Sequence, residues 1–73
     1  MKKYNFTVLI EKDPEVGLYV GEVSGLPGCH TQGKTIDELM VNMKEVIQLC
    51  LEGKTDVSQL PKFVGVQQLE ILH

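Results

Sequence analysis

Two side chains that could do chemistry stand next to each other in the middle of the chain, the thiol of Cys29 and the imidazole of His30. A nucleophilic site needs the thiol and the base within hydrogen-bond reach, and a third group that orients the base. Neighbouring residues of a strand point to opposite faces, so these two side chains cannot easily meet. We therefore expect no nucleophilic site here and predict that His30 is a surface or interface residue.

Metal-binding and phosphate-binding patterns are also missing from the sequence. The residues that could supply sulfur or imidazole ligands lack the spacing of a zinc site; they are Cys29, His30, Cys50 and His73. The central glycines do not lead from a strand into a helix as in a phosphate-binding loop; they are Gly25, Gly28 and Gly33. The sequence thus predicts no catalytic, cofactor-binding or metal-binding residue, no cofactor and no enzymatic activity.

The stretch from Ser24 to Leu51 carries the strongest local signals. Pro27 followed by Gly28 is typical of a type II turn, because proline pre-sets φ and glycine supplies the positive φ that follows. Gly33 allows a bend, and Thr35 with Glu38 three residues later forms a capping box at a helix start. The predicted structural motif consists of Leu26, Pro27, Gly28, Cys29, Gly33, Thr35 and Glu38.

A helix is predicted over residues 36–52, where apolar residues recur with a spacing of three and four. Gly53 follows the last periodic residue and is a natural terminator. The apolar face consists of Ile36, Leu39, Met40, Met43, Val46, Ile47, Cys50 and Leu51.

Alternation of apolar and polar residues predicts strands around this helix. The first covers residues 3–11, the second covers 18–23 after a proline and glycine turn, and a short third covers 29–32. We expect Tyr19 and Val23 to face the helix. The last strand, 63–72, is apolar on both faces, so either both faces are covered or a bulge near Gln67 resets the register.

This order predicts an α+β domain of the type β-β-β-α-β, with a mixed four-stranded sheet and one helix on one face. A right-handed crossover would place the last strand beside the first and parallel to it. The other face of the sheet would be open in a single copy, and alternation places the candidate partner-binding residues there: Asn5, Thr7, Leu9, Val20 and Glu22.

The length and the net charge of the chain restrict the functions that it could have. A chain of 73 residues predicts a single domain over 1–73. Such a chain buries only about 60% of its unfolded surface, so we expect a homodimer or a higher homo-oligomer. The net charge is −3 and every basic residue is lysine, which disfavours nucleic-acid binding and suits a basic protein partner. We expect a cytoplasmic protein with reduced cysteines, because the sequence shows neither a signal peptide nor a membrane span.

The central motif resembles the signature of HicB-type antitoxins over roughly residues 4–52. The residues that carry the resemblance are Tyr19, Leu26, Pro27, Gly28, Cys29, Thr31, Gly33, Thr35, Glu38, Leu39 and Asn42. The resemblance implies a truncated RNase H-like sheet. It also implies that the chain binds and occludes a HicA-type mRNA-cleaving ribonuclease toxin, as the antitoxin of a type II toxin–antitoxin system.

Nuclease activity of its own is not expected, because RNase H-like nucleases need clustered carboxylates and the interior of the first strand has none. A solitary HicB-like oligomeric interaction module without a cognate toxin remains as an alternative, and so does a small-molecule-binding or enzymatic domain. Many HicB-type antitoxins continue into a C-terminal DNA-binding domain. Only about twenty residues follow the helix here, so no such domain and no direct DNA binding are expected.

Overall fold

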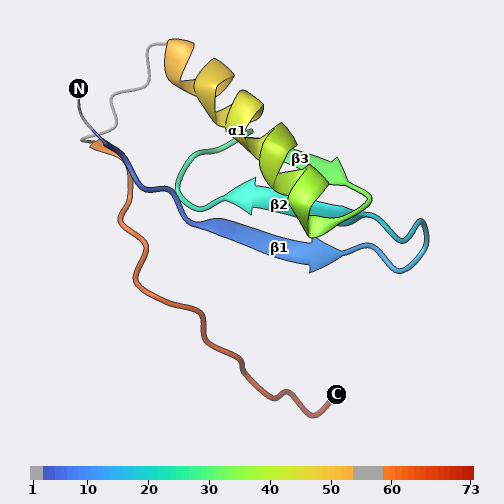
Figure 1. Cartoon of the computed structure of the whole chain (residues 1–73). Coiled ribbons are helices and arrows are strands. Elements are labelled where there is room, and N and C mark those ends of the chain that lie inside the picture. The colour runs from blue at the N-terminus through green and yellow to red at the C-terminus, as the bar shows by residue number, and fades with distance from the viewer. Residues whose placement is uncertain (1–2, 54–58) are drawn as a thin grey trace.

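A computed structural model describes residues 3–53 and 59–73 of the chain. It contains the strands β1 (Val8–Lys12), β2 (Tyr19–Val23) and β3 (His30–Gly33), followed by the helix α1 (Ile36–Glu52). The strands form an antiparallel sheet in the order β1-β2-β3, and α1 lies across one face (Figure 1). The α+β class and the helix bounds agree with the prediction. Among the described residues, no helix has the length and apolarity needed to cross a bilayer.

The hairpin between β1 and β2 is closed by backbone hydrogen bonds at its turn. The N–H of Asp13 donates to the carbonyl of Leu18 over 2.8 Å, and the N–H of Gly17 donates to the carbonyl of Asp13 over 2.8 Å. Gly17 has a φ of 70°, a value that glycine adopts without a steric cost. The predicted turn between the first two strands is therefore confirmed.

The motif before the helix folds as its local signals predict. The N–H of Cys29 donates to the carbonyl of Leu26 over 3.1 Å, and Gly28 has a φ of 80°, as a type II turn requires. Thr35 is the N-cap, and its hydroxyl accepts from the N–H of Glu38 over 3.0 Å. Within the described residues, Glu38 makes no reciprocal hydrogen bond, so only half of the predicted capping box forms.

The core lies between α1 and the β2 and β3 side of the sheet. Its buried side chains are Val23, Leu26, Cys29, Leu39 and Met43. The helix packs mainly on β3 and β2 and hardly touches β1. Gly21 makes this approach possible, because a Cβ there would lie 2.9 Å from Cε of Met43. The burial of Val23 and the half-burial of Tyr19 agree with the predicted orientation of β2.

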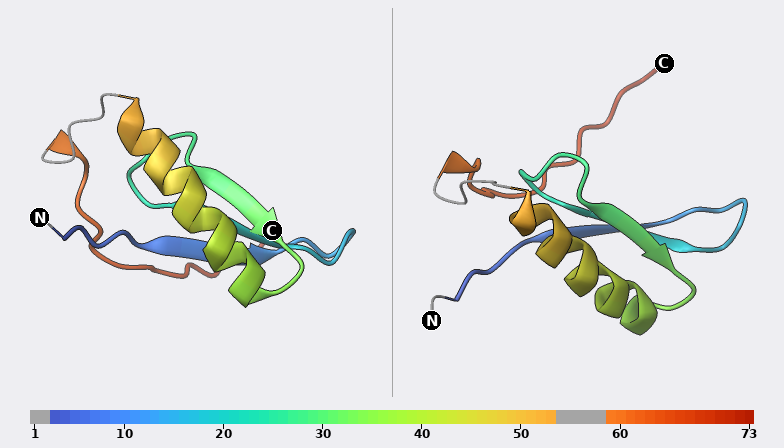
Figure 2. Two further views of the ribbon diagram at one scale, coloured as in Figure 1. Left: turned by 45° about the horizontal axis from the view of Figure 1, so that its top comes forward. Right: turned by 90° about the horizontal axis from the view of Figure 1, so that it is seen from above.

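The prediction of a fourth strand is wrong for the chain taken by itself. Residues 59–73 are described and contain no strand, and the sheet has three strands. The first strand is also shorter than predicted, since it begins at Val8 rather than at residue 3. Residues 63–73, which we name the C-terminal tail, run in the direction of β1 but leave on the side of the sheet opposite α1 (Figures 1 and 2). The tail makes no backbone hydrogen bond to β1 among the described residues, so it does not add a fourth strand to the sheet.

Candidate partner-binding face

The sheet face opposite α1 is not covered by the helix, and we name it the open face. Its side chains alternate with those that face the helix, so β1 contributes Leu9 and Glu11 and β2 contributes Val20 and Glu22. The register brings these four residues together, because Leu9 lies opposite Glu22 and Glu11 lies opposite Val20. On the other side of β2, Glu22 lies opposite His30 of β3. The open face is therefore an apolar pair bordered by two carboxylates and an imidazole.

A groove of about 630 Å³ follows the open face toward the C-terminal tail. It is lined by Leu9, Ile10, Glu11, Val20, Glu22, His30, Val66 and Gln68. Leu9 is 41% exposed and Val20 is half-buried, so the apolar pair still has surface that a partner could cover. The groove supplies the shape that an interface core needs, namely an apolar centre with polar groups around it.

The charge on the open face is negative. Glu11 and Glu22 are exposed there. The lysine nearest to them in sequence, Lys12, points to the helix side, where its ammonium lies 5.3 Å from the centre of the Tyr19 ring. The cation–π contact keeps this positive charge off the open face. A basic partner would thus meet two carboxylates without a competing lysine from β1.

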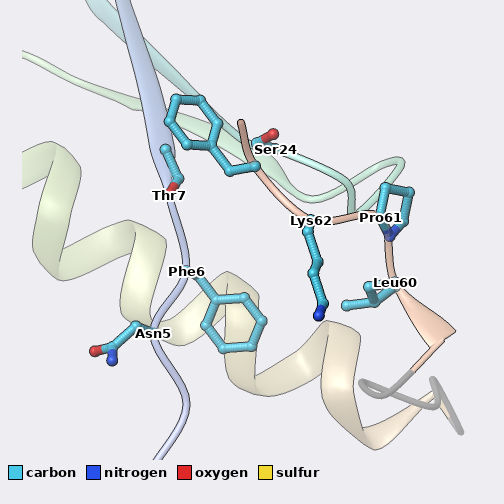
Figure 3. A pocket seen from close by; sticks show the side chains of 8 residues that line it. Asn5, Phe6, Thr7, Ser24, Leu60, Pro61 and Lys62 are labelled. Atoms are coloured by element: carbon cyan, nitrogen blue, oxygen red, sulfur yellow. The ribbon is translucent and has the colours of Figure 1, made fainter. Parts of the chain in front are cut away.

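Asn5 and Thr7 belong to a second hollow, at the place where the C-terminal tail begins. This pocket has a volume of about 310 Å³, and its lining comes from three segments that lie far apart in the sequence (Figure 3). One wall contains Asn5, Phe6 and Thr7, and the other contains Ser24 and Leu60–Phe63. Leu60 packs against the core, which holds this part of the chain in place.

The predicted partner-binding residues therefore divide into two groups. The groove brings together Leu9, Val20 and Glu22, whereas Asn5 and Thr7 line the pocket beside Pro61. The candidate set overlooked Glu11 and His30, although the alternation of β1 already placed Glu11 on the same side as Leu9. The participation of Val66 and Gln68 could not be read from local sequence, because it depends on the path of the tail.

Cys29 and His30, the two adjacent side chains with a nucleophilic atom and a base, lie apart in the structure. Cys29 is fully buried and His30 is exposed, so the two point to opposite faces as predicted. Burial and a hydrogen bond with the Cys50 thiol raise the pKa of Cys29 from 9.0 to about 12, which keeps it a neutral thiol. Across residues 3–53 and 59–73, no group of three or more His, Cys, Asp or Glu could hold a metal ion.

Comparisons with known proteins found one matching family model and several similar proteins. The sequence model described as "HicB_like antitoxin of bacterial toxin-antitoxin system" matches residues 6–71. The chain is 49% identical to a UPF0150 protein of Synechocystis sp. over 71 residues, which cover 97% of this chain and 100% of the relative. It is 53% identical to a UPF0150 protein of Archaeoglobus fulgidus over 90% of this chain and 93% of the relative. A UPF0150 protein of Thermotoga maritima is 44% identical over 90% of this chain and 88% of the relative. No solved structure matches significantly.

Proposed function

The chain belongs to the family of HicB-like antitoxins of bacterial toxin–antitoxin systems, and on this premise we propose that it binds and occludes a HicA-type mRNA-cleaving ribonuclease toxin. The observation that carries the proposal is the family match, which spans residues 6–71. An antitoxin of this kind acts by binding, so it needs a surface that fits its toxin and no catalytic group of its own. A toxin that cleaves mRNA places both proteins in the cytoplasm.

The open face supports this proposal through its shape and its charge. A ribonuclease that binds RNA must present basic residues to the phosphates. The carboxylates of Glu11 and Glu22 are exposed on the open face and would attract such a surface. Opposite charges of this kind raise the association rate and orient the two partners. We therefore place the toxin on the open face, with its RNA-binding surface toward these carboxylates.

The apolar and the charged residues of the open face would contribute to occlusion in different ways. Leu9 and Val20 would lose water on binding and slow the dissociation of the complex. Glu11 and Glu22 would remain near the rim, where they act mainly on the association rate. Because RNA and the antitoxin would compete for the same basic surface, a bound antitoxin blocks cleavage without any chemistry of its own.

The test is to express a HicA-type toxin, sought first among the genes next to that of this chain, and to titrate its RNA cleavage with the antitoxin. Increasing amounts of the antitoxin should abolish cleavage near a fixed stoichiometry, and a complex should elute as one peak in gel filtration. Continued cleavage together with separate elution would refute the antitoxin function. That result would leave the solitary interaction module as the explanation of this domain.

A further inference from the structure

The outer edge of β1 has backbone groups that no described residue of its own copy pairs. The N–H of Ser24 donates to the carbonyl of Thr7 over 2.9 Å, and the N–H of Asp13 donates to that of Leu18 over 2.8 Å. In an antiparallel pair, residues whose backbone groups face the partner strand alternate with residues whose groups face away. The backbone groups of Leu9 and Glu11 thus face β2. Those of Val8, Ile10 and Lys12 point outward, where another strand could bind.

The opposite edge of the sheet is less available. The N–H of Val23 donates to the carbonyl of Cys29 over 2.9 Å, and the register of β3 then turns the backbone groups of His30 and Gln32 outward. The side chain of Asn42 on α1 donates to the carbonyl of Gln32 over 2.9 Å. The helix therefore occupies part of the β3 edge, whereas the described residues leave the β1 edge open.

Apolar surface lies on both sides of the open edge. On the helix side, a groove of about 250 Å³ separates α1 from β1 and is lined by Phe6, Val8, Met40, Met43, Lys44 and Ile47. It exists because α1 packs on β3 and β2 and hardly on β1, which leaves Met40 43% exposed. On the open face, the apolar surface is that of Leu9 and Val20. A strand added at this edge would bury apolar side chains on both of its faces.

The C-terminal tail has the sequence of such a strand and lacks its pairing. Val64 and Val66 lie on one face of an extended chain, and Leu69 and Ile71 lie on the other. All four are largely exposed in a single copy, from 73% for Val66 to 97% for Val64. Within the described residues, the tail makes no backbone hydrogen bond. An exposed apolar edge and an exposed apolar strand in one chain each require a partner.

We propose that the C-terminal tail of one copy binds as a fourth strand along the β1 edge of a second copy, and that the exchange is reciprocal. Both halves of the interface are present in every copy, so a twofold arrangement satisfies both edges and both tails at once. The tail begins beside the pocket at Pro61 and runs on the side of its own sheet opposite α1 (Figure 2). Val66 and Gln68 line the groove of the open face there, but the tail makes no backbone hydrogen bond to its own β1 among the described residues.

Charge favours a second copy over a basic protein as the occupant of this edge. The chain has a net charge of −3, so two copies repel each other unless they meet through a neutral segment. Residues 63–72 contain one charged side chain, Glu70. A basic toxin would instead be drawn to the carboxylates of the open face. The two surfaces share Leu9 but differ in charge, and dimerisation through the tail does not depend on the existence of a toxin.

The first measurement is sedimentation of the full chain at micromolar concentration. We expect twice the monomer mass of 8.2 kDa. Leu69→Asp should weaken the dimer at least about tenfold, because it places a carboxylate in the apolar interface. Gln48→Glu adds the same charge at an exposed position of α1, outside the tail and the β1 edge, and should remain dimeric. Both side chains are exposed, so neither change should reduce the helical circular dichroism of the monomer.

Hydrogen exchange at single amides identifies the edge. In the wild-type dimer, the amides of Ile10 and Lys12 should exchange slowly, and Leu69→Asp should make both at least about tenfold faster. The amides of Leu9 and Glu11 pair with β2 and should not change, so they are internal controls. A monomeric wild type would overturn the proposed swap of tails between two copies, even if the copy's own tail protected the amide of Ile10. A dimer that survives Leu69→Asp, or one in which Ile10 and Lys12 exchange freely, would overturn it too.

Discussion

At the scale of single residues, Thr35 shows how one side chain fixes the start of the helix. Its hydroxyl accepts from the N–H of Glu38 over 3.0 Å and satisfies one of the donors that the first turn leaves without a partner. We predict that Thr35→Ala lowers the free energy of unfolding by about 1 kcal/mol. Thr35→Ser keeps the hydroxyl and should cost much less. Urea unfolding of the three proteins tests this, and equal midpoints would show that the cap contributes nothing.

The thiol of Cys29 gives the chain a pH dependence in the alkaline range. Burial and the Cys50 thiol raise its pKa from 9.0 to about 12 in the folded state, so the fold favours the neutral form. This contribution to stability is complete below pH 9 and is lost as the pH rises toward 12. The urea midpoint should therefore fall between pH 8 and pH 11. The fall should be smaller in Cys29→Ala, and identical pH slopes for the two proteins would contradict the assignment.

At the scale of elements, the contact between the end of β3 and the first turn of α1 depends on Gly33. A Cβ at Gly33 would lie 2.6 Å from the backbone nitrogen of Leu39 and 2.9 Å from its Cα. Backbone cannot move aside as a side chain can, so we predict that Gly33→Ala destabilises the protein by about 1–3 kcal/mol. Gly21→Ala is the matched comparison and should cost less, because its nearest neighbour is the flexible end of Met43. Thermal unfolding that ranks the two the other way would refute this explanation.

The elements that the sequence predicts well are those whose causes are local. The bounds of α1 follow from the cap at Thr35, the apolar period and the stop at Gly53, and the type II turn follows from Pro27 and Gly28. The fourth strand could not be predicted in this way. Alternation in the tail shows that residues 63–72 suit a strand, but pairing depends on which edge they reach. The hydrogen bond from Asn42 to Gln32, which covers the β3 edge, is likewise a product of tertiary packing.

The candidate site was also predictable only in part, because some of its residues are placed by tertiary packing. Alternation along β1 and β2 placed Leu9, Val20 and Glu22 on one face, and the structure brings them into one groove. Asn5 and Thr7 share the same alternation, but both precede the strand, which begins at Val8. They lie instead beside Pro61, because the chain returns to that point after the helix. Only the path of the whole chain separates the two groups.

At the scale of the whole molecule, two surfaces have different physical characters and, in our proposals, different partners. The β1 edge is apolar and meets a neutral tail, so it suits a second copy of this chain. The open face carries Glu11 and Glu22 and suits a basic toxin. A strand added at the β1 edge lies in the plane of the sheet and would leave the carboxylates accessible. A dimer would then present two toxin-binding faces.

The measurement that tests the central claim most directly is the binding rate of the toxin to Glu22→Lys, compared with Glu15→Lys, at several salt concentrations. Both variants reverse one exposed carboxylate, but Glu22 lies on the open face and Glu15 lies outside it, in the hairpin turn between β1 and β2. We predict that Glu22→Lys lowers the association rate several-fold at low salt and flattens its salt dependence, whereas Glu15→Lys behaves nearly like wild type. Equal rates for the two variants at every salt concentration would contradict toxin binding through the open face.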